Sequence, residues 1–111
     1  MDLKAFASLG VHGCSAITCL TAQNTKQITR VDAVPSDMLR EQLHAIMSDM
    51  NPEAAKTGAI YTAENGEVIA EMFSDQRVPL IIDPVDTYLF AHNPEPVRDS
   101  GSHGNQGLKY R

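Results

Sequence analysis

The longest run of helical spacing in this 111-residue chain lies near its middle. Four apolar side chains recur there at intervals of three or four residues: Leu39, Leu43, Ile46 and Met50. Residues at these intervals share one face of a helix, so the pattern predicts an amphipathic helix between Pro35 and Pro52. Shorter segments with the same periodicity predict two further helices, over residues 2–9 and 63–75.

The segments between these helices have the composition of strands. Residues 14–22 are small or apolar nearly throughout, which is typical of a central parallel strand covered on both faces. Residues 54–57 and 80–83 predict two more strands, and the alternation in residues 28–34 predicts an exposed strand or ribbon. Strands that alternate with helices form parallel sheets through right-handed crossovers, so we expect an α/β fold with a parallel sheet.

The pattern changes near residue 86. Three of the seven glycines fall between there and the end of the chain, and only two aliphatic side chains larger than alanine follow Ala91. So little apolar area cannot offset the conformational entropy of ordering the segment. We therefore expect a partial α/β domain over residues 1–85 and an irregular or disordered tail over residues 86–111.

Charge and cysteine content exclude several classes of protein. Nine Lys and Arg residues against fourteen Asp and Glu give a formal net charge of −5, which argues against binding to nucleic acid. No apolar run approaches the roughly 20 residues that span a bilayer. Two cysteines are too few for a disulfide scaffold. These features predict a cytoplasmic domain with reduced thiols.

Polar side chains lie at the carboxyl ends of the predicted strands, where ligands of open parallel sheets bind. They are Gln23 with Asn24, Lys56 with Thr57, and Asp83. The amide of Gln23 can read the edge of a heterocycle, although a polar turn uses the same residue type. Asp83 can hold a metal, act as a base or bind a hydroxyl, or it can simply form a turn. Asp2 begins the first helix, where capping is the alternative to ligand binding.

Four segments together carry a family resemblance: residues 2–6 (Asp-Leu-Lys-Ala-Phe), 21–25 (Thr-Ala-Gln-Asn-Thr), 55–58 (Ala-Lys-Thr-Gly) and 82–85 (Ile-Asp-Pro-Val). The chain resembles the N-terminal region of the hydroxymethylpyrimidine/phosphomethylpyrimidine kinases, which serve thiamine biosynthesis and belong to the ribokinase-like superfamily. The resemblance covers about residues 2–85. It implies a three-layer αβα sheet that is incomplete, because the family's chain is more than twice as long.

The resemblance also implies a reaction and a set of site residues. The reaction is ATP-dependent phosphorylation of hydroxymethylpyrimidine and then of its monophosphate. Asp2 and Gln23 match residues that bind the aminopyrimidine ring, and Val85 matches one that lines the pocket. Ala59 stands where the family usually has methionine, so it would pack more loosely on the ring. ATP and Mg²⁺ are implied, but the family's nucleotide site, anion hole and catalytic cysteine lie beyond the matched part, so we expect no catalytic residue and no metal ligand here.

We therefore expect a kinase fragment that carries half of a substrate pocket and is inactive alone. The alternatives are a non-catalytic module that binds the pyrimidine and a fragment that only folds or oligomerises. A pyridoxal kinase is a weaker match, because the segment at residues 21–25 fits the pyrimidine branch better. Three helices would leave apolar sheet surface and an open edge, so we also expect a homo-oligomer, most simply a dimer.

Overall fold

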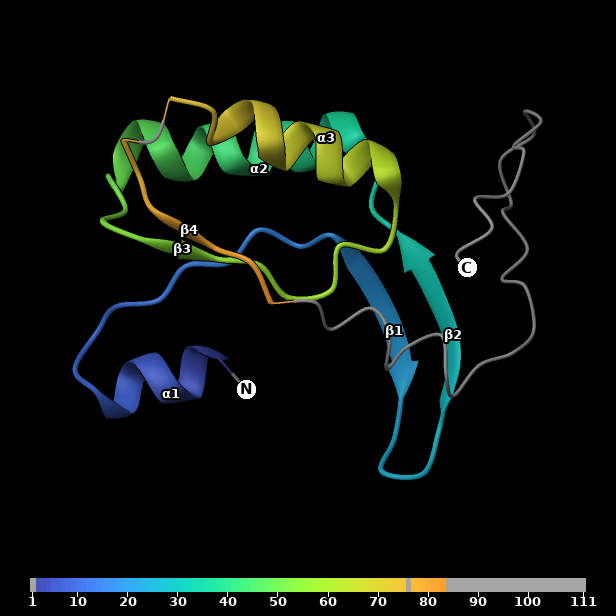
Figure 1. Cartoon of the computed structure of the whole chain (residues 1–111). Coiled ribbons are helices and arrows are strands. Elements are labelled where there is room, and N and C mark those ends of the chain that lie inside the picture. The colour runs from blue at the N-terminus through green and yellow to red at the C-terminus, as the bar shows by residue number, and fades with distance from the viewer. Residues whose placement is uncertain (1, 76, 84–111) are drawn as a thin grey trace.

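The computed structural model describes residues 2–75 and 77–83 of the chain. Along these residues the elements are α1 (Asp2–Ser8), β1 (Cys19–Gln23), β2 (Ile28–Ala33), α2 (Ser36–Asp49), β3 (Ala55–Lys56), α3 (Ala63–Met72) and β4 (Leu80–Ile81) (Figure 1). Val85 and the predicted tail lie outside the described residues. Within the described ranges, no helix has the length and apolar character needed to cross a bilayer.

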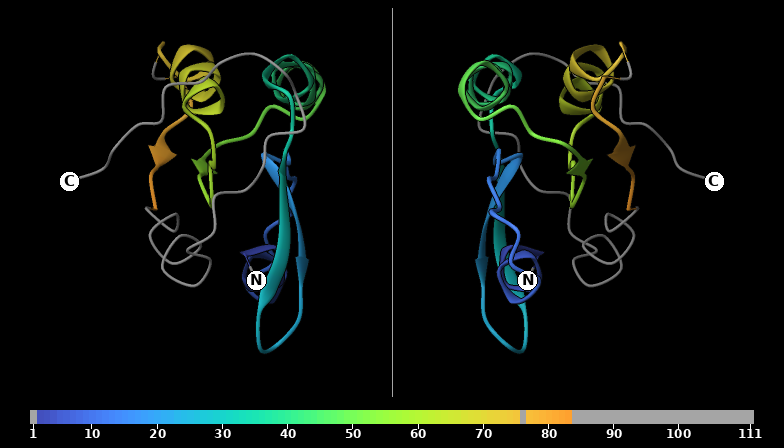
Figure 2. Two further views of the ribbon diagram at one scale, coloured as in Figure 1. Left: turned by 90° about the vertical axis from the view of Figure 1, so that its right-hand side faces the viewer. Right: turned by 90° about the vertical axis from the view of Figure 1, so that its left-hand side faces the viewer.

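The core lies between α2 and α3, which run side by side on one side of the strands (Figures 1 and 2). Its buried members are Leu39 and Leu43 from α2, with Val68 and Ile69 from α3. The apolar stripe predicted from the sequence therefore finds its partner within the chain. The stripe ends early, because Met50 at the C-terminus of α2 is half exposed.

Strands β3 and β4 form the predicted parallel pair. The backbone N–H groups of Ala55 and Thr57 donate to the carbonyls of Pro79 and Ile81, both at 2.9 Å. Helix α3 connects the two strands and covers them on the side of the core. The prediction of strands near residues 54–57 and 80–83 in a parallel arrangement is confirmed, although each strand is only two residues long.

The prediction of a central parallel strand over residues 14–22 is wrong. The strand is β1, it begins at Cys19, and it pairs antiparallel with β2 in a hairpin that extends away from the helices (Figure 1). A local turn explains the difference. The side-chain carbonyl of Asn24 accepts the backbone N–H groups of Lys26 and Gln27 at 2.8 and 3.0 Å, so the chain reverses at once. Most side chains of β1 are exposed, and its apolar character does not reflect burial on both faces.

The base of the hairpin is held by both core helices. The Asn65 amide Nδ2 donates to the carbonyls of Thr18 and Val34, at 3.2 and 3.1 Å, and the Val34 N–H donates to the Thr18 carbonyl at 2.9 Å. From α2, the Gln42 side chain pairs with both backbone groups of Ile17, at 2.8 and 3.0 Å. The direction in which the hairpin leaves the body is therefore set by one amide from each helix.

Helix α1 lies on the opposite side of β3 and β4 from the two core helices (Figures 1 and 2). The helix ends at Ser8, and Gly10 follows with a φ of +73°, the left-handed conformation that glycine adopts without strain. None of its residues is buried. Neither cysteine forms a disulfide bond within the described residues; Cys14 is exposed and its thiol donates to the Met50 sulfur at 3.0 Å.

Candidate functional site

Three charged side chains from distant parts of the chain meet at the carboxyl ends of β3 and β4. Lys56 ends β3, Asp83 follows β4, and Asp2 begins α1. The Lys56 ammonium lies 2.9 Å from Asp83 Oδ2 and 3.3 Å from Asp2 Oδ2. We call Asp2, Lys56, Thr57 and Asp83 the carboxyl-end cluster.

The parallel pairing of β3 and β4 determines half of this geometry. Thr57 directly follows β3, is only 6 % exposed, and its hydroxyl accepts the backbone N–H of Asp83 at 3.1 Å. That bond fixes the chain of Asp83 beside the end of β3, within reach of Lys56. The rule that ligands bind beyond the carboxyl ends of parallel strands predicted that Lys56, Thr57 and Asp83 would share this place. It could not place Asp2, because the path of residues 9–18 decides where α1 lies.

Electrostatics keep Lys56 charged. The pKa of its ammonium is raised, first by the hydrogen bond to Asp83 and also by the bond to Asp2, while desolvation opposes the rise. The three side chains are 28, 55 and 48 % exposed for Lys56, Asp2 and Asp83 respectively, so a ligand can reach the carboxylates from solvent. One ammonium between two carboxylates leaves the cluster with an excess of negative charge, which suits a ligand that presents hydrogen-bond donors.

The other predicted ring-binding residue lies elsewhere. Gln23 ends β1 near the tip of the hairpin, where it pairs with Ile28 at a register shift, and its side chain is exposed. Among the contacts of the described residues, none joins it to the carboxyl-end cluster. For the neighbouring Asn24, the polar-turn alternative is the one observed. A shared cavity of Gln23 and Asp2 stays a prediction.

Ala59 lies in the loop between β3 and α3. Its carbonyl accepts the Thr18 hydroxyl, which ties this loop to the base of the hairpin. Two residues further on, Tyr61 has a φ of +73°, a strained conformation for a non-glycine residue that costs about 1–3 kcal/mol. Burial raises the pKa of the Tyr61 phenol. The bond from Thr18 therefore holds this loop at the base of the hairpin. Val85, the remaining predicted site residue, is not among the described residues.

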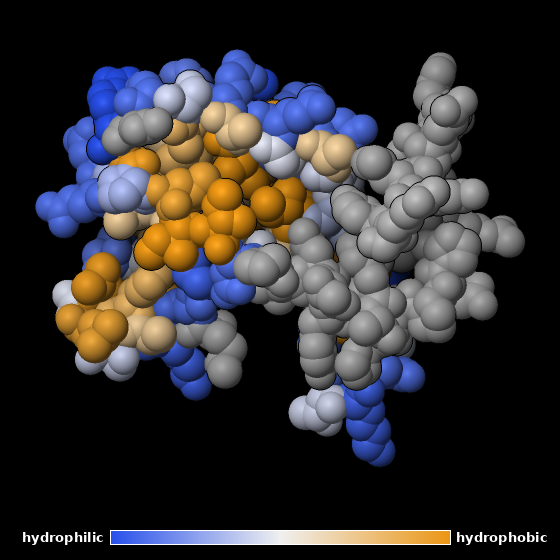
Figure 3. Space-filling view, viewed as in Figure 1, coloured by the Kyte–Doolittle hydropathy of each residue, from blue (hydrophilic) through white to orange (hydrophobic). Residues whose placement is uncertain are grey.

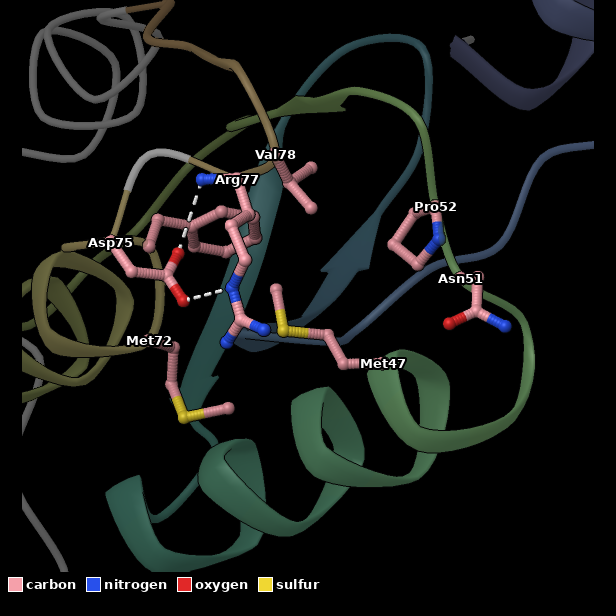
Figure 4. A pocket seen from close by; sticks show the side chains of 8 residues that line it. Met47, Asn51, Pro52, Met72, Asp75, Arg77 and Val78 are labelled. Atoms are coloured by element: carbon pink, nitrogen blue, oxygen red, sulfur yellow. Dashed lines mark hydrogen bonds and ion pairs between the residues drawn. The ribbon is translucent and has the colours of Figure 1, made fainter.

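Two open cavities lie away from the cluster, near the amino ends of β3 and β4. One, of about 260 Å³, lies between the C-terminal ends of α2 and α3, and the Met47 and Met72 side chains point into it opposite Arg77 (Figure 4). Its charged groups are already paired, because Arg77 binds Asp75. The other, of about 400 Å³, is an apolar groove lined by Ala70, Phe73, Val78, Pro79 and Leu80. Figure 3 shows apolar surface gathered below α3 on this face. Neither cavity is lined by Asp2, Gln23 or Ala59. No motif in the sequence predicted either cavity.

The chain is similar in sequence to known proteins. The sequence model of a family described as phosphomethylpyrimidine kinase matches residues 1–93. A hydroxymethylpyrimidine/phosphomethylpyrimidine kinase of Synechococcus elongatus is 50 % identical over 84 residues, which are 76 % of this chain and 32 % of that protein. The corresponding kinase of Staphylococcus aureus is 33 % identical over 105 residues, or 94 % of this chain and 37 % of that protein. The chain thus spans about a third of the length of the curated relatives it matches.

Solved structures agree with the sequence matches. A phosphomethylpyrimidine kinase of Clostridium difficile superposes with a TM-score of 0.74 at 36 % identity, covering 79 % of this chain and 41 % of that one. A pyridoxal kinase of Staphylococcus aureus in complex with pyridoxal gives a TM-score of 0.64 at 29 % identity, covering 76 % of this chain and 32 % of that one. Both the sequence identity and the superposition are higher for the pyrimidine kinase than for the pyridoxal kinase.

Proposed function

The chain belongs to the phosphomethylpyrimidine kinase family, and from this premise we propose that it supplies part of the substrate pocket of an ATP-dependent pyrimidine kinase. The reaction would be phosphorylation of hydroxymethylpyrimidine and then of its monophosphate, in thiamine biosynthesis. The observation that carries the proposal is the carboxyl-end cluster, where Asp2 meets Lys56 and Asp83 at the edge at which parallel sheets bind ligands.

The proposed substrate contacts follow from the chemistry of an aminopyrimidine. Lys56 binds Asp2 through Oδ2, so the second carboxylate oxygen is available to accept a hydrogen bond from the exocyclic amine. Gln23 would satisfy a ring nitrogen with its amide N–H. Ala59 and Val85 would pack on the ring, with Ala59 leaving more room than a longer apolar side chain.

The described residues bring few metal-binding side chains together. Among them, no three His, Cys, Asp or Glu side chains lie close enough together to hold a metal ion. The two carboxylates that do face each other share the Lys56 ammonium. We therefore derive no catalytic step through the metal or the nucleotide, and we propose that groups outside the described residues bind both.

Transfer of a phosphoryl group depends on metal, hydrogen-bond donors and positioning, so these residues alone would not turn over substrate. The alternative function is a non-catalytic module that retains affinity for the pyrimidine. A fragment that only folds or oligomerises is the third possibility. A cytoplasmic location, where ATP is available, is also part of the proposal.

Calorimetric titration of the full chain with hydroxymethylpyrimidine, with and without ATP and Mg²⁺, separates the three functions. We expect binding without turnover. Gln23→Ala should weaken that binding about 5- to 150-fold, because ring polar groups lose their partner. Gln27→Ala, in the turn of the same hairpin, is the matched control. Absence of any binding to the unaltered chain would refute the pocket, and turnover by the chain alone would refute its incompleteness.

We further propose that the chain forms a homodimer. Two adjacent side chains at β4, Ile81 and Ile82, are 62 and 69 % exposed, and the apolar groove adjoins the beginning of the same strand. Apolar surface beside a strand edge favours association. Sedimentation over a wide concentration range should give a dimer at micromolar concentration, with Ile82→Lys shifting it to monomer. A monomer at all concentrations would refute the dimer without bearing on the pyrimidine site.

A further inference from the structure

Helix α1 has few attachments to the rest of the protein. None of its residues is buried, and its backbone bonds beyond the helix join it to the turn that directly follows, through Leu9, Gly10 and Val11. Gly13 passes close beneath the Leu3 and Phe6 side chains, in the same stretch of chain. Within the described residues, the polar contact that links α1 to a distant element is the ion pair of Asp2 with Lys56.

Lys56 is itself held firmly at the other end of this link. Its ammonium lies 2.9 Å from Asp83 Oδ2, 3.3 Å from Asp2 Oδ2 and 3.3 Å from the Thr57 carbonyl. An ammonium group has three hydrogens, so these three oxygens use its full donor capacity. The Thr57 hydroxyl fixes the backbone of Asp83, and Thr57 is buried at the end of the parallel pair. A continuous series of contacts therefore runs from β3 and β4 through Lys56 to Asp2.

We propose that Lys56 is a positioning residue: it fixes the Asp2 carboxylate, and with it α1, at the carboxyl ends of β3 and β4. Lys56 binds Oδ2 of Asp2, and this contact fixes the orientation of the carboxylate and therefore the direction of its other oxygen. Without the ammonium between them, the Asp2 and Asp83 carboxylates would repel each other. The consequence for ligand binding rests on the proposed function, whereas the attachment of α1 does not.

Hydrogen exchange of the α1 backbone amides, measured by NMR on the full chain, tests the attachment. Lys56→Met keeps most of the aliphatic stem and removes the charge. We expect about two- to fivefold faster exchange in α1, because loss of a partly exposed ion pair raises the population of the locally open state by a factor of that size. Exchange in α2 and α3 should not change. Lys26→Met, which removes the same charge from the hairpin turn, is the matched control and should leave α1 unchanged.

Two further variants separate positioning from a general effect of charge. Lys56→Arg can still bridge both carboxylates and should restore slow exchange. In an Asp2→Asn background, Lys56→Met should cause no additional acceleration, because the two changes break the same contact. Unchanged α1 exchange in Lys56→Met, or full additivity with Asp2→Asn, would overturn the proposal.

Titration with hydroxymethylpyrimidine supplies the functional arm. Lys56→Met should raise the dissociation constant about three- to tenfold while Lys26→Met does not, and the difference should vanish in the Asp2→Asn background. If the unaltered chain does not bind the pyrimidine at all, the proposed function fails, and hydrogen exchange alone still decides whether Lys56 positions α1. Equal affinity of the unaltered chain and Lys56→Met would show that the attachment does not serve this ligand.

Discussion

Replacing Asn65 with alanine should release the base of the hairpin from the core. Asn65 is fully buried, and its amide donates to the carbonyls of Thr18 and Val34. Each bond contributes about 0.5–1.5 kcal/mol net, and a buried group left without a partner costs about 1–3 kcal/mol. Both carbonyls lose the amide, but the Thr18 carbonyl keeps its bond from the Val34 N–H, so the Val34 carbonyl is the one whose hydrogen bond is not replaced. The Asn65 Oδ1 atom is buried without a partner within the described structure, so its removal offsets part of the loss.

These terms combine to a loss of about 2 kcal/mol in the free energy of unfolding, a large fraction of the roughly 5–15 kcal/mol typical of a domain. Urea unfolding followed by circular dichroism measures it, and the melting temperature should fall by roughly 8–16 °C. Glu67→Ala, at an exposed position of the same helix, should stay within about 0.5 kcal/mol of the unaltered chain. Hydrogen exchange should accelerate more in β1 and β2 than in α2. A loss for Asn65→Ala no larger than for Glu67→Ala would refute the argument.

Three other changes test the rest of the fold. Leu39→Ala removes a 1 % exposed core side chain and should cost about 2–5 kcal/mol in urea unfolding, whereas Met38→Ala, at a half-exposed neighbour, should cost far less. The Arg40 hydrogen bond lowers the pKa of Glu71, so this pair stabilises the fold above the ordinary carboxyl pKa and stops doing so as the pH falls through the lowered value; the melting temperatures of Glu71→Gln and the unaltered chain should therefore converge between pH 6 and pH 3. Gly13→Ala would place a Cβ 2.7 Å from the flexible end of a leucine side chain of α1, so that side chain must move and the α1 amide shifts should change, with little change in melting temperature; unchanged shifts would contradict the close approach.

The sequence predicted best those helices and strands that follow a regular periodic pattern along the chain. The stripe that includes Leu39 and Leu43 identified α2, and alternation of strands with α3 identified the parallel pair of β3 and β4. The prediction of a central parallel strand over residues 14–22 was wrong because a small, apolar segment has the same composition whether it is covered on both faces or exposed in a ribbon. The deciding signal was the turn at Asn24, whose side chain closes the hairpin.

The carboxyl-end cluster was predictable only in part. Lys56 ends β3 and Asp83 follows β4, so the parallel pairing of these strands brings the two side chains together. Asp2 had to be inferred from family resemblance, because its position depends on a loop of irregular backbone for which no periodic pattern exists. No local pattern predicted that Lys56 would bind both carboxylates, since ion pairing with Asp2, 54 positions away, does not depend on the neighbouring sequence.

The two strand pairs differ in how much chain must be ordered before each can form. The hairpin of β1 and β2 closes across four turn residues, whereas β3 meets β4 only after the 23 residues from Thr57 to Pro79 have been brought round through α3. Hairpins form within about 1–10 μs, and contacts between distant residues form more slowly because loop closure must precede them. We therefore expect the ribbon to form early and transiently during folding, and to become permanent only when α3 docks and Asn65 reaches its base. On this pathway the carboxyl-end cluster is assembled last, because it requires β3, β4 and α1 together.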